Sequence, residues 1–292
     1  MRVVRYNDVA DYYARVEPFL VAHEAEHNLP LGILSSLLKS PGYYSEYLLA
    51  VIEDDAAELV AISMQTPPHN IILSLVAPQA DPAEVITTLA DNLRADHETL
   101  PGVVGPNALA LLFAQLWQAR SGQSYHLSKH ERIYKLTTVR PVAGVSGMMR
   151  RAGEADRVLL RDWLVAFERE VFDEGNPTDT EVMLNTMLTS PTRGVYLWED
   201  DGRVVSLAAY GGPTPNGIRI GPVYTPPDAR GKGYASACVA ELSQMLLDGG
   251  RRFCFLFTDL GNPTSNHIYQ TIGYEPVSDV DMYLFGEMAS PR

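Results

Sequence analysis

The stretch that most constrains this chain is an apolar strand (218–224) that runs through a glycine-containing loop into an amphipathic helix. The start of a helix leaves about four backbone N–H groups without intrahelical partners and carries roughly half a positive charge, so it attracts anions. Gly231 and Gly233 let the main chain approach an anion closely and adopt positive φ without steric cost. Arg230 and Lys232 add positive charge at the same place. The sequence therefore predicts a cradle for a pyrophosphate.

The spacing of the loop distinguishes among the families that use such a cradle. A Walker loop needs a glycine five residues before the Gly-Lys pair and a Ser or Thr after the lysine, where this chain has Pro226 and Gly233. A dinucleotide fingerprint needs a third glycine at the position of Ser236. Asp259 stands near the distance expected for the acidic residue of that fingerprint, but the missing glycine argues against it.

A third pattern, Arg/Gln-x-x-Gly-x-Gly/Ala, is met by Arg230, Gly233 and Ala235. With it, the segment resembles the coenzyme A signature of the GNAT N-acetyltransferase superfamily. The resemblance implies acetyl-CoA as co-substrate, its pantetheine arm held by main chain at 223–225 and its pyrophosphate by main chain at 231–236. The binding residues that it implies here are Val223, Tyr224, Thr225, Arg230, Gly231, Lys232, Gly233, Tyr234, Ala235 and Ser236.

A second motif lies downstream. The apolar run 253–258 is typical of a strand in a parallel pair that is buried on both faces. Asn262 and Pro263 read as N-cap and first residue of a helix that ends before Gly273. Positions 262, 265, 266 and 269 share one face of this helix. In the GNAT family that face meets the coenzyme near its thiol, so the resemblance adds these residues to the site: Asn262, Ser265 and Asn266 for binding, and Tyr269 as the catalytic acid.

Composition limits the class of protein. With 292 residues, 46% hydrophobic and 20% charged, the chain is expected to form about two globular domains. Its net charge of −13 argues against a nucleic-acid partner, because phosphate backbones need a positive surface, and fits a cationic acceptor such as an amine.

The cysteines and the lengths of the apolar runs bear on the cellular compartment. Cys238 and Cys254 fall on apolar positions, which indicates core thiols in a reducing compartment. The first residues form no signal-peptide core, and no apolar run approaches the ~18 residues of a membrane span. We therefore expect a cytoplasmic protein without a membrane partner.

The two halves of the chain repeat one succession of elements. Each half reads as strand, two helices, hairpin, strand, helix, strand, helix and strand, and a linker at 140–147 separates them. The predicted fold class is α/β, with two tandem GNAT-like domains. Each would have a mixed, mostly antiparallel sheet with helices on both faces and a splayed parallel strand pair. The predicted domains are a degenerate GNAT-like domain (1–139) and a catalytic GNAT domain (148–292).

The first half departs from the family at its cradle position. Residues 76–82 contain no Gly-x-Gly pair and no arginine, and Pro82 removes an N–H from the helix start. This domain is expected to have lost the coenzyme and to shape the acceptor pocket or an oligomer contact. An unrelated domain with a similar run of elements stays open as an alternative.

His23 and His27 form a competing constellation, because residues 23–27 match H-E-x-x-H, the zinc metalloprotease helix. Residues 28–30, Asn-Leu-Pro, end the helix immediately, and no further ligand stands at the extended-motif spacing. The simpler interpretation is a polar helix end, and no metal is expected.

The predicted chemistry is direct transfer of an acetyl group from acetyl-CoA to a primary amine of a small molecule or peptide. The general base stays open: the strand 218–224 carries no carboxylate, and Glu170, Asp173, Glu174, Asp259 and a water relay are the candidates. The missing carboxylate also motivates an alternative from another class, a non-catalytic acyl-CoA sensor. The sequence does not identify the acceptor, and a homodimer is one option for assembly.

Overall fold

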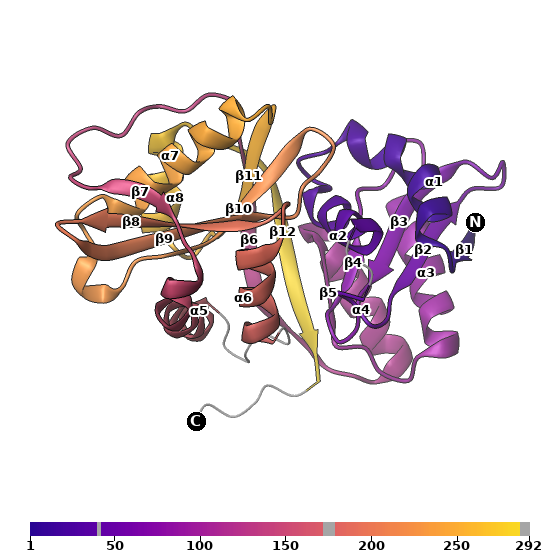
Figure 1. Ribbon diagram of the computed structural model, residues 1–292. Coiled ribbons are helices and arrows are strands. Elements are labelled where there is room, and N and C mark those ends of the chain that lie inside the picture. The colour runs from indigo at the N-terminus through magenta and orange to yellow at the C-terminus, as the bar shows by residue number, and fades with distance from the viewer. Residues whose placement is uncertain (40–41, 172–178, 287–292) are drawn as a thin grey trace. The chain divides into compact units, whose positions relative to one another are not determined.

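The computed structural model describes residues 1–39, 42–171 and 179–286 and divides the chain into two compact units (Figure 1). The first unit consists of Met1–Arg132, Asp259–Gly261 and the chain from Ser278 onward. The second unit consists of Ile133–Thr258 and Asn262–Val277. The chain therefore returns to the first unit near its C-terminus.

The first half of the chain contains six strands and four α-helices within the described residues. They are β1 (Arg2–Tyr6), α1 (Val9–Ala22), α2 (Asn28–Lys39), β2 (Leu48–Glu53), β3 (Leu59–Gln65), β4 (Ile71–Leu73), α3 (Pro82–Asp96), β5 (Gly102–Pro106), α4 (Asn107–Ser121) and β6 (Tyr125–Leu136). Asp8 caps α1 by accepting the Asp11 N–H, and the helix continues through Pro18.

The second half has the same succession of elements. They are β7 (Met148–Arg151), the 3₁₀ turn η1 (Glu154–Asp156), α5 (Arg157–Val171), α6 (Thr180–Thr189), β8 (Gly194–Asp200), β9 (Arg203–Gly211), β10 (Gly217–Tyr224), the 3₁₀ turn η2 (Pro227–Ala229), α7 (Tyr234–Asp248), β11 (Phe253–Asp259), α8 (Pro263–Ile272) and β12 (Glu275–Phe285). Among described residues, no helix is both long and apolar enough to span a bilayer; the longest have 15 residues.

The strands form an α/β fold with one hydrogen-bonded series of twelve strands, in the order β1-β2-β3-β4-β5-β12-β6-β11-β10-β9-β8-β7. The sequence predicted a separate sheet for each domain, and the series is instead continuous. Each unit contains a parallel pair, β4 with β5 and β10 with β11, beside antiparallel neighbours such as β2 with β3 and β8 with β9.

Each unit has hydrophobic clusters on both faces of its strands. In the second unit, one cluster joins α7 and α8 to β10 and β11 through residues such as Cys238, Leu242 and Ile272. A second cluster joins α5 and α6 to β8 and β9 through Leu164, Leu184 and others. Strand β10 thus packs on helices of the same unit on both faces, with Ile218 and Ile220 toward α7 and Tyr224 toward α5.

The closing strands β6 and β12 each have residues in both units. In the first unit β12 pairs antiparallel with β5, from Val280 opposite Pro106 to Leu284 opposite Gly102. Arg132 on β6 forms a two-bond ion pair with Asp279 on β12, with Nε–Oδ1 and Nη2–Oδ2 distances of 2.6 and 2.9 Å.

Asp279→Asn should reduce the free energy of unfolding at pH 7 by about 1 kcal/mol, since this pair is only partly buried. The hydrogen bond from Arg132 lowers the pKa of Asp279. Its stabilisation is therefore present above the unfolded-state pKa of about 3.9 and is lost as the pH falls through the lower folded-state pKa. Urea unfolding of the wild type and the variant at pH 7 and pH 3 should show a difference that shrinks at pH 3. A difference of equal size at both pH values would contradict the ionic origin.

Candidate functional site

Strand β10 leads into the predicted site and separates from its parallel neighbour. The two strands pair from Gly217 opposite Phe253 to Arg219 opposite Phe255 and no further. On its other side β10 pairs with β9, with a shift in register between Ile220 and Val223. The parting of β10 from β11 is the splay that the sequence predicted for this pair. The main chain at 223–225 therefore lies beyond the last parallel bridge.

The loop after β10 depends on glycine at two positions. Gly231 has φ = 77° and Gly233 has φ = 83°, a conformation that other residues adopt only with strain. A Cβ on Gly231 would meet nothing within 4 Å, whereas one on Gly233 would lie 2.9 Å from Val145 Cγ2. Position 233 thus requires glycine for two reasons, its positive φ and its close contact with Val145. Position 231 requires glycine for its positive φ alone.

The N-terminus of α7 is open to a ligand. Gly233 is the N-cap residue and offers no side chain to the helix. Within the residues that the structure describes, the N–H groups of Tyr234, Ala235 and Ser236 make no hydrogen bond. Three such groups at the positive end of a 15-residue helix fit an anion.

The corresponding helix of the first unit, α3, begins differently. Its N-cap Asp81 accepts a hydrogen bond of 3.0 Å from the Ala83 N–H, and Pro82 follows at N1. A carboxylate therefore already occupies the helix start, and one N–H is missing. This contrast supports the prediction that the first half does not bind the coenzyme.

Arg230 points to acceptors of the protein itself. Its Nη2 lies 2.8 Å from both carboxylate oxygens of Glu170 at the end of α5, and its Nε donates to the Thr225 carbonyl at 2.8 Å. The guanidinium carbon lies 5.8 Å from the centroid of the Tyr224 ring. These contacts link the two ends of the loop, Thr225 and Arg230, to Glu170 of α5. Arg230 therefore stabilises the conformation of the loop.

Glu170→Gln should weaken coenzyme binding two- to fivefold, because an ion pair with half-exposed partners contributes at most about 1 kcal/mol. Titration calorimetry with acetyl-CoA measures the change. Asp228→Asn is the matched control: it removes an ion pair of the same loop, with Arg203 at 2.5 Å, that does not involve Arg230. Tighter binding by Glu170→Gln would show instead that the carboxylate competes with the ligand for Arg230.

The loop contains a second cation, and the first helical residue is anchored. Lys232 is exposed, with Nζ 6.0 Å from the centroid of the Tyr234 ring. The Tyr234 hydroxyl donates to Asp200 Oδ2 at 2.5 Å, and this hydrogen bond lowers the pKa of Asp200 and raises that of Tyr234. Asp200 thus fixes the first residue of α7 and stays ionised.

The start of α8 is held by its own polar side chains. Asn262 Oδ1 accepts the Ser265 N–H at 3.0 Å, as predicted for an N-cap, and Asn266 Nδ2 donates to the Asn262 carbonyl at 2.8 Å. Tyr134 on β6 donates to Asn266 Oδ1 at 3.1 Å and accepts from Gln270 Nε2 at 3.0 Å. Asn262 and Asn266 therefore shape the helix start before any ligand binds.

Tyr269 lies on the buried side of α8, in the same cluster as Tyr234 and Cys238 of α7. Its side chain is 9% exposed, and burial raises its pKa to about 12. The ring meets that of Tyr274 edge to face, with centroids 5.9 Å apart. The helices of the two motifs, α7 and α8, thus share one hydrophobic core. The raised pKa makes the Tyr269 phenol a weaker acid than a free tyrosine.

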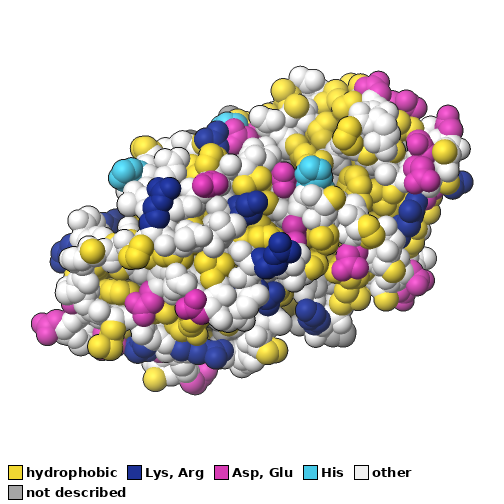
Figure 2. All heavy atoms as spheres, turned by 90° about the horizontal axis from the view of Figure 1, so that it is seen from above, with side chains coloured by type: hydrophobic (Ala, Val, Ile, Leu, Met, Phe, Trp, Pro, Cys, Tyr) yellow, Lys and Arg dark blue, Asp and Glu magenta, His cyan; other side chains and the backbone are white. Residues whose placement is uncertain are grey.

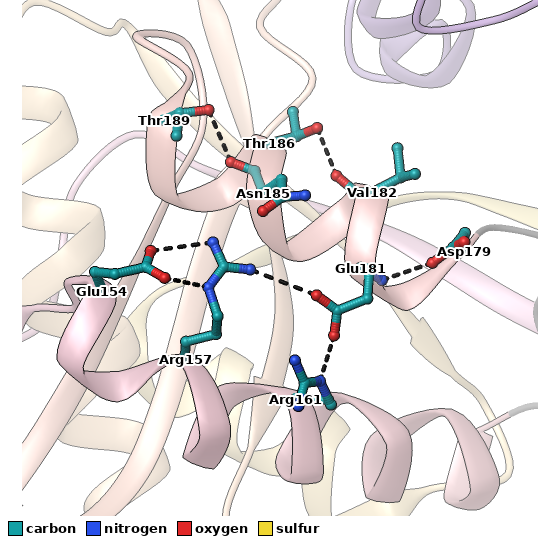
Figure 3. Close-up of polar contacts among 9 residues, drawn as sticks. All are labelled: Glu154, Arg157, Arg161, Asp179, Glu181, Val182, Asn185, Thr186 and Thr189. Atoms are coloured by element: carbon teal, nitrogen blue, oxygen red, sulfur yellow. Dashed lines mark hydrogen bonds and ion pairs between the residues drawn. The ribbon is translucent and has the colours of Figure 1, made fainter.

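Helix α5, which carries Glu170, is fixed to α6 by ion pairs (Figure 3). Glu181 of α6 accepts from Arg161 and, at 3.5 Å, from Arg157, which also pairs with Glu154. Among the candidate bases, Glu170 is committed to Arg230, and Asp259 is exposed and accepts the Gly261 N–H at 2.6 Å. Asp173 and Glu174 lie outside the described residues.

The His23/His27 constellation does not have the geometry of a metalloprotease helix. Helix α1 ends at Ala22, so residues 23–27 form turns. Nδ1 of the buried His27 contacts the Leu20 carbonyl at 3.0 Å, and its Nε2 accepts the Leu75 N–H at 3.1 Å. Both ring nitrogens of His27 are therefore engaged by main chain, and burial lowers its pKa to about 4, so the ring stays neutral. This arrangement argues against the zinc alternative.

With this geometry in place, comparison with known proteins defines the class. Residues 157–274 match the acetyltransferase (GNAT) family, and this segment includes the splayed strand pair, the glycine loop and α8. This segment of the second half is thus a GNAT acetyltransferase sequence by its match to the family.

The particular relatives extend the likeness in fold to the whole chain. A GCN5-related N-acetyltransferase from Sphaerobacter thermophilus is 17% identical with a TM-score of 0.60, covering 99% of this chain and 98% of that one. A tandem GNAT protein from the clavulanic acid biosynthesis pathway is 14% identical with a TM-score of 0.58, covering 99% of both chains. A Drosophila protein is 12% identical with a TM-score of 0.70, covering 97% of this chain and 98% of that one. No curated protein sequence matches the chain. At these identities the likeness shows that the chain shares its fold with these proteins, one of which is a tandem GNAT protein.

Several supporting residues were not predicted from the sequence. Asp200 under Tyr234, Val145 against Gly233, Tyr134 behind α8 and the Glu170–Arg230 pair are all distant in the chain from the groups that they support. No local spacing marks them, because each depends on which strands and helices become neighbours. Of the four, only Glu170 had been singled out, as a candidate base.

Proposed function

We propose that this protein transfers an acetyl group from acetyl-CoA to the primary amine of a small molecule or peptide. The observation that carries the proposal is the N-terminus of α7, where three N–H groups behind Gly233 have no acceptor among the described residues. At Gly231 of the same loop an added Cβ would meet nothing within 4 Å, so the main chain there is accessible to a diphosphate. Acetyl-CoA supplies a thioester as acyl donor.

The residues of this chain have distinct roles in the proposed reaction. Main-chain N–H groups at 231–236 and the Lys232 ammonium bind the diphosphate. Main chain at 223–225, where β10 has left β11, orients the pantetheine arm and donates to the carbonyl oxygen as negative charge develops there. Asn262, Ser265 and Asn266 shape the start of α8, and Tyr269 provides a proton for the leaving sulfur.

The raised pKa of Tyr269 limits this last role. Transfer of a proton from a phenol with a pKa of about 12 to a thiolate of about 8.5 is uphill by about 5 kcal/mol. Hydrogen bonding of the phenol to the developing thiolate, with full transfer from solvent afterwards, avoids most of this cost. Tyr269 is therefore proposed to stabilise the leaving sulfur more than to protonate it.

Two observations favour a second candidate, a non-catalytic acyl-CoA sensor. The strand β10 carries no carboxylate that could serve as base, and the tyrosine is a weak acid. Titration calorimetry with acetyl-CoA tests binding, and thiol release with a panel of amines separates enzyme from sensor. Steady release above the buffer rate supports the transferase, binding without release supports the sensor, and the absence of binding contradicts both.

On the face shown in Figure 2, basic side chains are interspersed with acidic, hydrophobic and uncharged ones. No continuous basic surface is visible there, in agreement with the net charge of −13. The proposed partners are accordingly acetyl-CoA and an amine acceptor.

A further inference from the structure

The last peptide of β10 is oriented by a buried serine of the neighbouring strand. Ser206 on β9 is fully buried, and its hydroxyl donates to the Tyr224 carbonyl at 3.2 Å. A second hydrogen bond of 2.8 Å joins the Ser206 hydroxyl to that of Thr225. Because the Ser206 proton goes to the carbonyl, the Thr225 hydroxyl is the donor of this second bond. The two hydroxyls and the carbonyl therefore form one chain of hydrogen bonds.

This chain of hydrogen bonds fixes the direction of the Thr225 N–H. The peptide between Tyr224 and Thr225 is trans, so its C=O and its N–H point to opposite sides. The carbonyl turns toward Ser206 and hence toward β9, and the N–H turns to the opposite side of β10. The neighbour of β10 on that side is β11, whose parallel pairing ends at Arg219 opposite Phe255. The Thr225 N–H therefore points to the side on which the two strands have separated.

The Thr225 N–H has no acceptor among the residues that the structure describes. A backbone N–H without a protein partner needs water or a ligand, because leaving it unsatisfied costs free energy. The next peptide is fixed as well, since the Thr225 carbonyl accepts Arg230 Nε at 2.8 Å and Pro226 has no N–H. Residue 225 thus offers one unused donor from a backbone that is held on both sides.

The amides that follow β4 in the first unit differ from this arrangement. The Leu75 N–H donates to His27 Nε2 at 3.1 Å, and the Ala77 N–H donates to the Val60 carbonyl at 2.8 Å. Both amides are therefore used by the protein itself in the unit that is expected to have lost the coenzyme. The contrast supports a ligand as the acceptor of the Thr225 N–H.

We propose that Ser206 is a positioning residue of the acetyl transfer, which keeps the Thr225 N–H directed at the carbonyl oxygen of the thioester. The inference rests on the proposed function, which assigns the main chain at 223–225 to this carbonyl. As the amine nitrogen bonds to the carbonyl carbon, negative charge develops on the oxygen, and a fixed N–H stabilises it. The C–S bond then breaks, the nitrogen loses one proton, and the leaving sulfur gains one. Ser206 acts on this step only through the Thr225 N–H.

Ser206→Ala and Thr225→Val each break the chain of hydroxyls and are tested singly and together. Kinetics with saturating acetyl-CoA and an accepted amine measure kcat, and calorimetry with CoA measures the affinity for the coenzyme. The resonance of bound acetyl-CoA labelled with carbon-13 at its carbonyl reports the hydrogen bond to the thioester without any turnover. Ser243→Ala is the matched control, because Ser243 is equally buried and its hydroxyl bonds that of Tyr274 at 2.9 Å.

Ser206→Ala and Thr225→Val should each lower kcat about tenfold, part of the roughly 100-fold effect of losing an oxyanion donor, because the N–H remains but is no longer fixed. The double variant should lose no more than about twofold further, because both hydroxyls act in one chain. Affinity for CoA, which has no thioester carbonyl, should stay within about twofold of the wild type. The carbonyl resonance should move downfield on binding to the wild type and to Ser243→Ala, and less in the other variants.

Three outcomes overturn the inference: an unchanged kcat in both single variants, an equal loss of kcat in Ser243→Ala, or a carbonyl resonance that is the same in every variant. If Ser206→Ala does not fold, Thr225→Val decides, because its side chain is only partly buried. If acetyl-CoA does not bind to the wild type, the proposed function fails, and this inference fails with it. If acetyl-CoA binds and both single variants behave as the wild type does, only this inference fails.

Discussion

Gly233→Glu is expected to abolish coenzyme binding, with the Kd for acetyl-CoA raised at least about 100-fold. Three effects act together at this position. The residue has φ = 83°, which costs a non-glycine residue roughly 1–2 kcal/mol. Its Cβ would lie 2.9 Å from Val145 Cγ2, so the loop must shift. The new carboxylate would stand at the helix start, where the diphosphate is expected to bind. Titration calorimetry with acetyl-CoA measures the loss.

Gly250→Glu is the control for this variant. Gly250 has φ = 98°, with nothing within 4 Å of an added Cβ, and it lies just beyond the other end of α7. The substitution introduces the same charge and a comparable backbone strain. Binding should persist in Gly250→Glu, and unchanged binding in Gly233→Glu would remove the basis for the coenzyme site.

Tyr269→Phe is expected to lower kcat about 100-fold, the usual effect of removing one hydrogen-bond donor to a charge that develops in the transition state. The change removes only the hydroxyl of a buried ring, so acetyl-CoA affinity should be retained. Thiol release with an accepted amine measures kcat. If kcat remains within twofold of the wild type, Tyr269 has no part in the reaction.

The pH dependence of the wild type gives an independent check on Tyr269. Burial raises its pKa from 10 to about 12, so the phenol is protonated throughout the range below about pH 11. Loss of activity between pH 8 and 10 should therefore be the same in the wild type and in Tyr269→Phe. Tyr274→Phe is the structural control, because this neighbour shares the ring contact and bonds Ser243 at 2.9 Å, and it should lower stability while sparing kcat.

Much of the site could be predicted from the sequence because it depends on local backbone requirements. Glycines at 231 and 233, the Asn262–Pro263 helix start and the Gly273 stop each follow from the conformation that one residue adopts, and the structure has them as predicted. The assignment of coenzyme and catalytic roles to these residues remains a prediction. The role of Arg230 was open, since whether it meets a ligand or Glu170 depends on where α5 packs.

The strand order could not be predicted in this way. Both halves show the same succession of elements, so the sequence predicted a separate sheet in each half. In the structure, β6 and β12 instead join the strands of both halves in one continuous series. An apolar, alternating strand fits the edge of either sheet, and the choice is made by pairs such as Arg132–Asp279, which are 147 residues apart.

By itself, the sequence determined the order of elements, the conformation of the glycine loop and the family that this segment resembles, because glycine, proline and capping residues act within a few positions of themselves. Only the tertiary structure decided which strands pair, that Tyr269 is buried enough to become a weak acid, and that Glu170 pairs with Arg230. The physical reason is that burial and charge proximity depend on chain segments far apart in sequence, which become neighbours only when the strands have paired.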